Sequence, residues 1–530
     1  MATPREEALA WWRERVEEER YAGERGELPS PAAEQYLHDE RLIASTPGRW
    51  GWVVVTPDME DRDAALRQNY WKLAGVLLAA YAPAAIERIS AVRLWMGEAF
   101  TPPLLQVSHA SSASERRVEI APGLAVALRP ARKAGGGESG EARDAAPELA
   151  TEEVEVDGVR LPVVPPARLL LSLTVTDIRD HRDLVLTWLQ SLVVSRPELE
   201  AAYEADPRPV LFARIGQLAR AVGNDRLAEQ VRRVSATHQR WPISRAVTGV
   251  GALAVPAYIV SQPSLREPWL DRFRAKLARA AEVAAGVVRG EGLELSPASP
   301  GAVLDQARRA KAEDTYHSTT IEGYRITRGQ VQSVLAGAPL DSPDRAETER
   351  LMALKGYAQA FERTLAEAAE GAAADGGPRL SEALALDLYV ELWSPSVDAE
   401  IMSAVQLRGW RKEPVYIRGS AYVPPAPVKV PQLMRVWADT LNEMEMDPVS
   451  RAAVAHWGFV HVHPFLDGNG RLSRLLMNLV LCGSGLPWTT IRAEERRDYF
   501  AALEAAHVGE EYEPFARFVV SRVARALESW

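Results

Sequence analysis

The chain has 530 residues, of which 47% are hydrophobic and 25% are charged, a composition typical of a globular protein and unlike a disordered or fibrous chain. This length exceeds what one core usually serves, so several domains are expected. The formal net charge of -10 disfavours phosphate binding over the whole surface, and any nucleic-acid site would need a local basic patch.

Three features indicate a reducing compartment without a membrane anchor. Cys482 is the single cysteine, so the chain cannot form an intrachain disulfide. The first twenty residues are charged and lack the apolar region of a secretion signal. The longest apolar stretch, residues 246–260, is interrupted by Gly251 and Pro256 and is shorter than the ~20 residues of a membrane helix. We therefore predict a cytoplasmic protein that does not cross a membrane.

The first sixty residues predict a small unit that resembles a winged helix. Residues 6–20 and 31–43 have charged and apolar types at helical spacing, and residues 50–56 form a β-like run. Residues 1–60 hold seven arginines and thirteen acidic residues, a net charge of -6, which is the wrong sign for a DNA-binding face. A structural or protein-binding role is favoured, and DNA binding stays open as an alternative.

Residues 61–240 predict an α+β accessory domain. The pattern is helical over residues 63–81 and 180–195, and strand-like over residues 118–130 and 159–165. Residues 134–153 are polar, rich in glycine and alanine and without periodicity, which is typical of a mobile insertion.

The order of three segments in this half resembles the AbiEi-type antitoxins, which pair a winged helix with an α/β domain. The segments are TPD at residues 56–58, LRPARK at 128–133 and DGVRLPVVPPARLLLSL at 157–173. No catalytic signature accompanies them. The resemblance implies a DNA-binding regulator as an alternative function of another class.

Residues 241–267 are punctuated by glycine and proline and predict a linker, and residues 268–530 predict a helical bundle. Within that bundle, EPVYIRGSAYV at residues 413–423 places Gly419 and Ser420 between two β-like runs, which predicts a β-hairpin. The predicted fold class is therefore a multidomain protein: a mainly α C-terminal bundle with a β-hairpin flap, preceded by an α+β region. Helices are expected at residues 269–288, 302–318, 346–370, 380–392, 430–445, 450–461, 470–481 and 492–507.

The sequence DGNG, which runs directly into the amphipathic segment RLSRLLMNLVL, predicts an anion site. The amides of Gly468, Asn469 and Gly470 would point at whatever precedes the helix, where the helix dipole is positive. Arg471 and Arg474 lie in the first turn, where cations are disfavoured by ~0.3–1 kcal/mol each. A bound polyphosphate would compensate for that placement.

Two further side chains complete the predicted chemistry. Asp467 offers the carboxylate oxygen that Mg²⁺ shares with phosphates. His463 precedes Pro464 at the mouth of the same loop and is a candidate general base. Together these groups suit attack of a hydroxyl on a phosphate. A zinc site at His456, His461 and His463 is disfavoured, since their spacing does not place three imidazoles on one helical face.

These residues match the signature of the Fic family, H-x-F-x-[DE]-G-N-G-R-x-x-R, at every defined position. The resemblance implies transfer of AMP from ATP to a Ser, Thr or Tyr hydroxyl of a target protein. His463 would deprotonate that hydroxyl, Asp467 would hold Mg²⁺, and the turn with Arg471 would hold the phosphates. Phe465 would pack beneath the loop. The matching residues are His463, Phe465, Asp467, Gly468, Asn469, Gly470, Arg471 and Arg474.

Two other segments resemble the same family. The run VYIRGSAYVPP resembles the flap that aligns a target segment by main-chain pairing. The resemblance implies that Tyr499 and Phe500 fill aromatic positions bordering the adenine, and His507 departs from the family pattern because many relatives have asparagine there. The flap residues are Val415, Tyr416, Ile417, Arg418, Gly419 and Ser420.

A third segment, STTIEG at residues 318–323, resembles the family's inhibitory motif [ST]-x-x-x-E-[GN], of which Ser318 and Glu322 are the defined residues. The resemblance implies that Glu322 pairs with Arg474 and competes with the ATP γ-phosphate for it. The predicted protein is thus an autoinhibited adenylyltransferase, with residues 268–530 as the Fic domain. Transfer of another nucleotide or phosphoryl group, or removal of AMP, remains an alternative. A regulatory protein partner and a homodimer are compatible with the chain.

Overall fold

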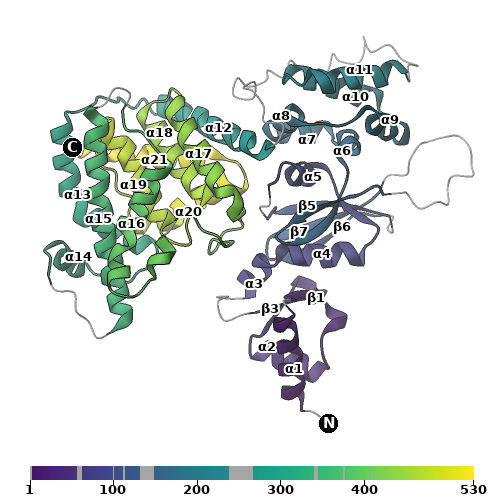
Figure 1. Cartoon of the computed structure of the whole chain (residues 1–530), viewed down its shortest axis with the longest axis horizontal. Helices are drawn as coiled ribbons and strands as arrows, with labels where there is room; N and C mark the ends of the chain where they lie inside the picture. The colour runs from purple at the N-terminus through teal and green to yellow at the C-terminus, as the bar shows by residue number, and fades with distance from the viewer. Residues whose placement is uncertain are drawn as a thin grey trace, which may run out of the picture. The chain divides into compact units, whose positions relative to one another are not determined.

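The computed structural model describes the chain in two compact units (Figure 1). The first comprises residues 1–272 and 416–423, and the second comprises residues 273–415 and 424–530. The described residues are all except 1–2, 19, 56–61, 99–100, 111–113, 132–148, 238–266, 339–343, 374–376 and 408. The predicted linker at 241–267, most of the predicted insertion at 134–153 and the apolar stretch at 246–260 lie outside the described residues.

The first unit begins with two helices against a small sheet. α1 (Pro4–Glu17) and α2 (Pro31–Asp39) both start at a proline, a residue well suited to the first helical turn. β1 (Ala22–Glu24), β2 (Ile43–Ser45) and β3 (Gly51–Val54) form an antiparallel sheet in the order β1-β3-β2. The sequence predicted only the last of these strands, because the other two are only three residues long.

A six-stranded mixed sheet follows, in the order β6-β7-β5-β4-β9-β8. β5 pairs in parallel with β7 and β4 with β9, while the other three pairs are antiparallel. The strands are β4 (Ala84–Ile86), β5 (Leu104–His109), β6 (Arg116–Ala121), β7 (Leu124–Pro130), β8 (Glu152–Val156) and β9 (Val159–Val163).

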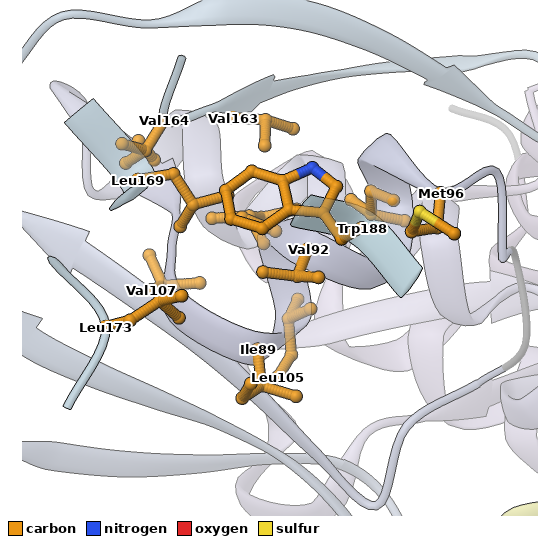
Figure 2. Close-up of a cluster of buried hydrophobic side chains, with 14 of the residues drawn as sticks. Ile89, Val92, Met96, Leu105, Val107, Val163, Val164, Leu169, Leu173 and Trp188 are labelled. Carbon is orange, nitrogen blue, oxygen red and sulfur yellow. The ribbon is translucent and has the colours of Figure 1, made fainter. Parts of the chain in front are cut away.

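Helices surround this sheet and bury its apolar side chains. Figure 2 shows one cluster, in which Trp188 of α8 (Arg182–Ser191) packs among aliphatic side chains of the sheet and of α5 (Arg88–Trp95). The remaining helices are α3 (Arg62–Gln68), α4 (Tyr70–Ala80), α6 (Pro166–Ser172), α7 (Val175–Asp180), α9 (Arg196–Ala205), α10 (Pro209–Ala221) and α11 (Asp225–Thr237).

The second unit is helical in its described residues, and α19 (Asn469–Gly483) contacts α13, α15, α16 and α18 (Figure 1). Every residue of α19 except Gly470 is buried, so it forms the centre of the bundle. The other helices are α12 (Pro268–Gly290), α13 (Pro300–Ile321), α14 (Arg328–Leu335), α15 (Arg345–Ala373), α16 (Glu382–Asp398), α17 (Val430–Glu443), α18 (Pro448–Val462), α20 (Arg496–Val508) and α21 (Tyr512–Glu528). Short 3-10 turns are η1 (Arg25–Glu27), η2 (Pro47–Arg49), η5 (Ala404–Leu407), η6 (Pro427–Lys429) and η7 (Ala493–Glu495).

The mainly helical C-terminal part and the α+β N-terminal part are confirmed, but the hairpin prediction is wrong. Residues 413–423 contain no strand. Gly419, with φ of 71°, makes a turn in which the Ser420 amide donates to the Ile417 carbonyl at 3.1 Å, and the flanking segments form no ladder with each other. The turn signal was correct, while the two β-like runs beside it form no strand ladder with each other. None of the described helices is both long and apolar enough to span a bilayer.

Candidate active site

His463 lies at the end of α18, where the helix stops in a left-handed residue. Its backbone has φ of 50° and ψ of 60°, and its amide donates to the Phe459 carbonyl at 2.9 Å. The ring Nδ1 lies 3.3 Å from the Val460 carbonyl. A carbonyl oxygen can only accept, so Nδ1 carries the proton and Nε2 presents a lone pair. The geometry selects the tautomer that a base requires.

The surroundings of His463 keep its imidazole neutral. Burial in the bundle, reinforced by the positive charge of Arg411, lowers the pKa of His463 to about 4, against weaker opposing effects of the Val460 carbonyl and of Asp467. At neutral pH the ring is therefore free to accept a proton.

Arg411, which the sequence analysis did not single out, anchors this end of the helix. Its Nε donates to the His463 carbonyl at 2.7 Å, its Nη1 to the Glu413 carbonyl at 3.1 Å, and its Nη2 to the Pro425 carbonyl. The side chain is buried. Arg411 belongs to no sequence motif, so its role in binding these backbone carbonyls is seen only in the structure.

Two sets of contacts fix the loop after His463: an aromatic stack against α16 and the side-chain hydrogen bonds of Asn469. Phe465 stacks on Tyr389 of α16, with ring centroids 3.8 Å apart and planes at 3°. Asn469 closes the loop, because its side chain accepts from the Phe465 amide at 3.0 Å and donates to the Phe465 carbonyl at 2.8 Å. The predicted packing position of Phe465 is the observed one, and Asn469 is part of the loop's framework.

Replacing Phe465 with alanine should destabilise the second unit. Its ring is 1% exposed and loses the Tyr389 stack, so we expect a loss of ~3–5 kcal/mol of unfolding free energy. Chemical denaturation of the full chain, followed by tryptophan fluorescence, measures this. Leu466→Ala is the matched control, because Leu466 is 42% exposed and should cost less than ~0.5 kcal/mol.

The glycine turn brings the chain close to α16 and leaves the first turn of α19 without a side-chain cap. Gly468 has φ of 85°, and a Cβ there would lie 2.8 Å from Leu392 Cδ2 and 3.0 Å from Trp393 Nε1. Only glycine fits both restrictions. Gly468 is the N-cap, and because glycine has no side chain, no side-chain cap hydrogen bond occupies the first amides of α19.

Arg471 is a buried cation that makes a long ion pair with Asp467 and no hydrogen bond within the described residues. Its side chain is 0% exposed, and none of its three guanidinium nitrogens makes a hydrogen bond within the described part of the chain. The rings of Trp393 and Tyr324 lie 4.7 and 5.4 Å from its guanidinium carbon, and the nearer oxygen of Asp467 is 3.5 Å away. A buried arginine without hydrogen bonds is costly, and an anionic ligand at this position would satisfy its donors.

Asp467 differs from the other signature residues in being exposed. Its Oδ1 accepts from the Gly468 amide at 2.6 Å, and 58% of its side chain is open to solvent. The described residues contain no cluster of three or more side chains of metal-ligating type. A single accessible carboxylate beside an anion site fits Mg²⁺, which takes most of its ligands from phosphate and water.

Arg474 and Glu322, which are 152 residues apart, meet above the start of α19. Arg474 Nη2 donates to Glu322 Oε1 at 2.6 Å. Glu322 is the C-cap of α13, and Gly323 follows it with φ of 97°. A Cβ on Gly470 would lie 2.5 Å from Glu322 Oε1, so the carboxylate occupies the space directly over the glycine turn.

The three predicted adenine neighbours do not share one environment. Tyr499 is 1% exposed and its hydroxyl lies 2.8 Å from His456 Nε2, whereas Phe500 is half-buried beneath Arg496. His507 is buried, with its Nδ1 3.2 Å from His461 Nδ1. Phe500 is thus the accessible ring of the three. The predicted flap residues, Val415 to Ser420, are described above as a turn without strands.

Comparison with known proteins finds a family model that matches part of the second unit. Residues 379–481 match the model of the Fic/DOC family. The chain is 31% identical over 229 residues to the protein adenylyltransferase Fic of Drosophila willistoni, covering 42% of each chain. It is 29% identical over 250 residues to that of Drosophila melanogaster, covering 43% of this chain and 44% of the relative. The chain therefore spans less than half the length of the curated relatives it matches.

Solved structures include a Fic domain containing signaling protein from Bacteroides thetaiotaomicron. It shares 21% identity with the chain, covers 48% of this chain and 95% of its own, and has a TM-score of 0.37. The low TM-score indicates only a distant structural likeness.

Proposed function

We propose that the chain is a protein adenylyltransferase whose activity Glu322 restrains, a proposal supported by the match of residues 379–481 to the Fic/DOC family model. It transfers AMP from ATP to a hydroxyl of a target protein. The observation that carries the proposal is the buried guanidinium of Arg471, which makes no hydrogen bond to the described residues and belongs to the first turn of α19, whose amides have no side-chain cap. A polyphosphate satisfies both.

The site residues divide the reaction among themselves. Nε2 of His463 takes the proton of the target hydroxyl as its oxygen attacks the α-phosphorus of ATP. The bond from that phosphorus to the bridging oxygen breaks, and pyrophosphate leaves. The amides at the start of α19 and Arg471 hold the phosphates and stabilise the charge that develops on them. Mg²⁺ held by Asp467 would neutralise part of the phosphate charge.

Glu322 supplies the restraint. Its carboxylate pairs with Arg474 at 2.6 Å and occupies the space over Gly470 that an anion would take. An arginine donates its fork either to this carboxylate or to a phosphate, so the two compete for one partner. The 22% exposure of the Glu322 side chain makes displacement by a stronger ligand feasible.

Incubating the purified chain with labelled ATP and Mg²⁺ tests the proposal through self-modification. We expect weak labelling of the parent chain and none without Mg²⁺. Competition by UTP, GTP and CDP-choline in the same assay identifies the nucleotide. Release of AMP from a modified protein without any forward labelling would instead show the reverse reaction.

The rate should be insensitive to pH around the ordinary histidine range. A lowered pKa, about 4 for His463, means that the neutral base persists as pH falls from 8 to 6, and its protonation removes activity only well below that range. We therefore expect less than about a twofold change in rate over this interval. A rate that halves near pH 6.5 would show that His463 titrates normally.

A further inference from the structure

A buried chain of hydroxyl groups connects Arg474 to a second carboxylate. Arg474 Nε donates to Ser318 Oγ at 3.1 Å, and Ser318 Oγ lies 2.9 Å from the hydroxyl of Tyr357 in α15. That hydroxyl lies 2.7 Å from Asp314 Oδ2, and Thr490 Oγ1 donates to Asp314 Oδ1 at 2.9 Å. Asp314 and Arg474 are 2% exposed, and Ser318 and Tyr357 are 0% exposed.

Counting protons fixes the direction of this chain. A guanidinium only donates, so Ser318 Oγ must accept from Arg474. Ser318 then has its own proton to give, and Tyr357 is its neighbour along the chain. Tyr357 in turn donates its single hydroxyl hydrogen to Asp314 Oδ2. Burial raises the pKa of Asp314, and the hydrogen bonds from Tyr357 and Thr490 oppose this by favouring the ionised carboxylate. The links run from the cation to the carboxylate, and the two charges are joined through two polarised hydroxyls.

One face of α13 therefore presents two carboxylates to the same arginine. Asp314, Ser318 and Glu322 follow one another at intervals of four residues, which places them along one side of the helix. Glu322 contacts Arg474 directly and is partly exposed, while Asp314 acts through the hydroxyls and is sealed inside. The Glu322 carboxylate can therefore move out into solvent, whereas the Asp314 carboxylate stays enclosed in the helical bundle.

The two carboxylates also engage different edges of the guanidinium. The hydroxyl chain takes Nε, whereas Glu322 takes Nη2, which also donates to the Ser318 carbonyl at 2.8 Å. Arg474 Nη1 is buried without a hydrogen bond among the described residues. Once Glu322 moves away, the Nη edge is available to a phosphate while Nε stays anchored. A buried arginine without any remaining counter-charge would be strongly destabilised.

We propose that Asp314, acting through Tyr357 and Ser318, is a positioning residue that holds Arg474 ready for the nucleotide phosphates after Glu322 has been displaced. The inference rests on the proposed function. Asp314 thus belongs to the active state of the enzyme, although it lies on the same helix as the inhibitory glutamate.

Steady-state kinetics in a Glu322→Gly background test the assignment. Asp314→Asn and Tyr357→Phe should each raise KM for ATP about 10- to 100-fold, the scale of a lost charge-assisted hydrogen bond, and change kcat less than about twofold. Ser318→Ala should raise KM likewise, and Ser318→Thr, which keeps the hydroxyl, should restore it. An unchanged KM in both Asp314→Asn and Tyr357→Phe would overturn the proposal.

A second experiment tests the link without activity. Thermal unfolding of the full chain is compared for Asp314→Asn, Arg474→Met and the double variant. The double variant should lose less than the sum of the two single losses, and this coupling should vanish in a Tyr357→Phe background. Additive losses of stability would contradict the hydrogen-bonded relay from Asp314 through Tyr357 and Ser318 to Arg474. Coupling in a chain that transfers no AMP would refute the proposed function and leave the relay standing.

Discussion

Glu322→Gly should raise the rate of self-modification at ATP concentrations below saturation by about 10- to 100-fold, the equivalent of one charge-assisted hydrogen bond. The variant removes the carboxylate that holds Arg474 Nη2 at 2.6 Å and clears the space over Gly470. Initial rates with labelled ATP and Mg²⁺, for the parent and the variant at equal concentration, give the ratio.

Glu400→Gly is the matched control for this variant. Glu400 is exposed, has φ of 54° in the turn after α16, and loses the same charge on conversion to a residue that tolerates this backbone. We expect its rate to equal that of the parent. Glu322→Gln separates charge from bulk: an intermediate rate indicates that the ion pair and the occupied space both contribute. Equal rates for Glu322→Gly and the parent would exclude inhibition by Glu322.

His463→Ala, made in the Glu322→Gly background, should lower the transfer rate by about 10²- to 10⁴-fold, the usual contribution of a general base. The neutral ring, protonated on Nδ1 beside the Val460 carbonyl, is the proposed proton acceptor. Single-turnover measurements with labelled ATP determine the rate of the chemical step.

Retained ATP affinity distinguishes a lost base from a collapsed site. His463 is not among the groups proposed to hold phosphate, so titration calorimetry should give an ATP affinity within about twofold of the background variant. A transfer rate in His463→Ala equal to that of the background would show that another group is the base.

The parts of the site that are local in sequence could be predicted, because turn chemistry and helix starts depend on neighbouring residues. The segment from His463 to Arg474 contains its own glycine turn, the amides proposed to bind an anion, and two cations. Asn469 shows the limit of that reasoning, since its side chain closes the loop through both Phe465 backbone groups and is not directed at a ligand alone. The sequence predicted the turn and the start of the helix, but it did not predict the hydrogen-bond partners of the side chains.

Contacts between distant segments needed the fold or a family resemblance. The approach of Glu322 to Arg474 spans 152 residues, and no periodicity or local pattern specifies it. Arg411 was missed because its partners are backbone carbonyls, which every residue has. Residues 413–423 were predicted to be a hairpin from β-branched and aromatic types, yet pairing depends on cross-strand contacts that the segment does not make.

The relay from Asp314 to Arg474 could not be predicted from the sequence either, because it also joins distant segments. Tyr357 lies 43 residues from Asp314 on another helix, and Thr490 lies far beyond both. Their common environment is a dry interior, where each hydroxyl must find a partner and each charge must be balanced. That requirement becomes a testable network only when the helices are placed together.

Which phosphate of ATP reaches the protein is the most direct measurement of the central claim. Glu322→Gly is incubated in parallel with ATP labelled on the α-phosphate and with ATP labelled on the γ-phosphate, and incorporation into the chain is compared. Transfer of AMP predicts label from the α-position alone. Label from the γ-position would show phosphoryl transfer, and it would contradict the assignment of this site as an adenylyltransferase.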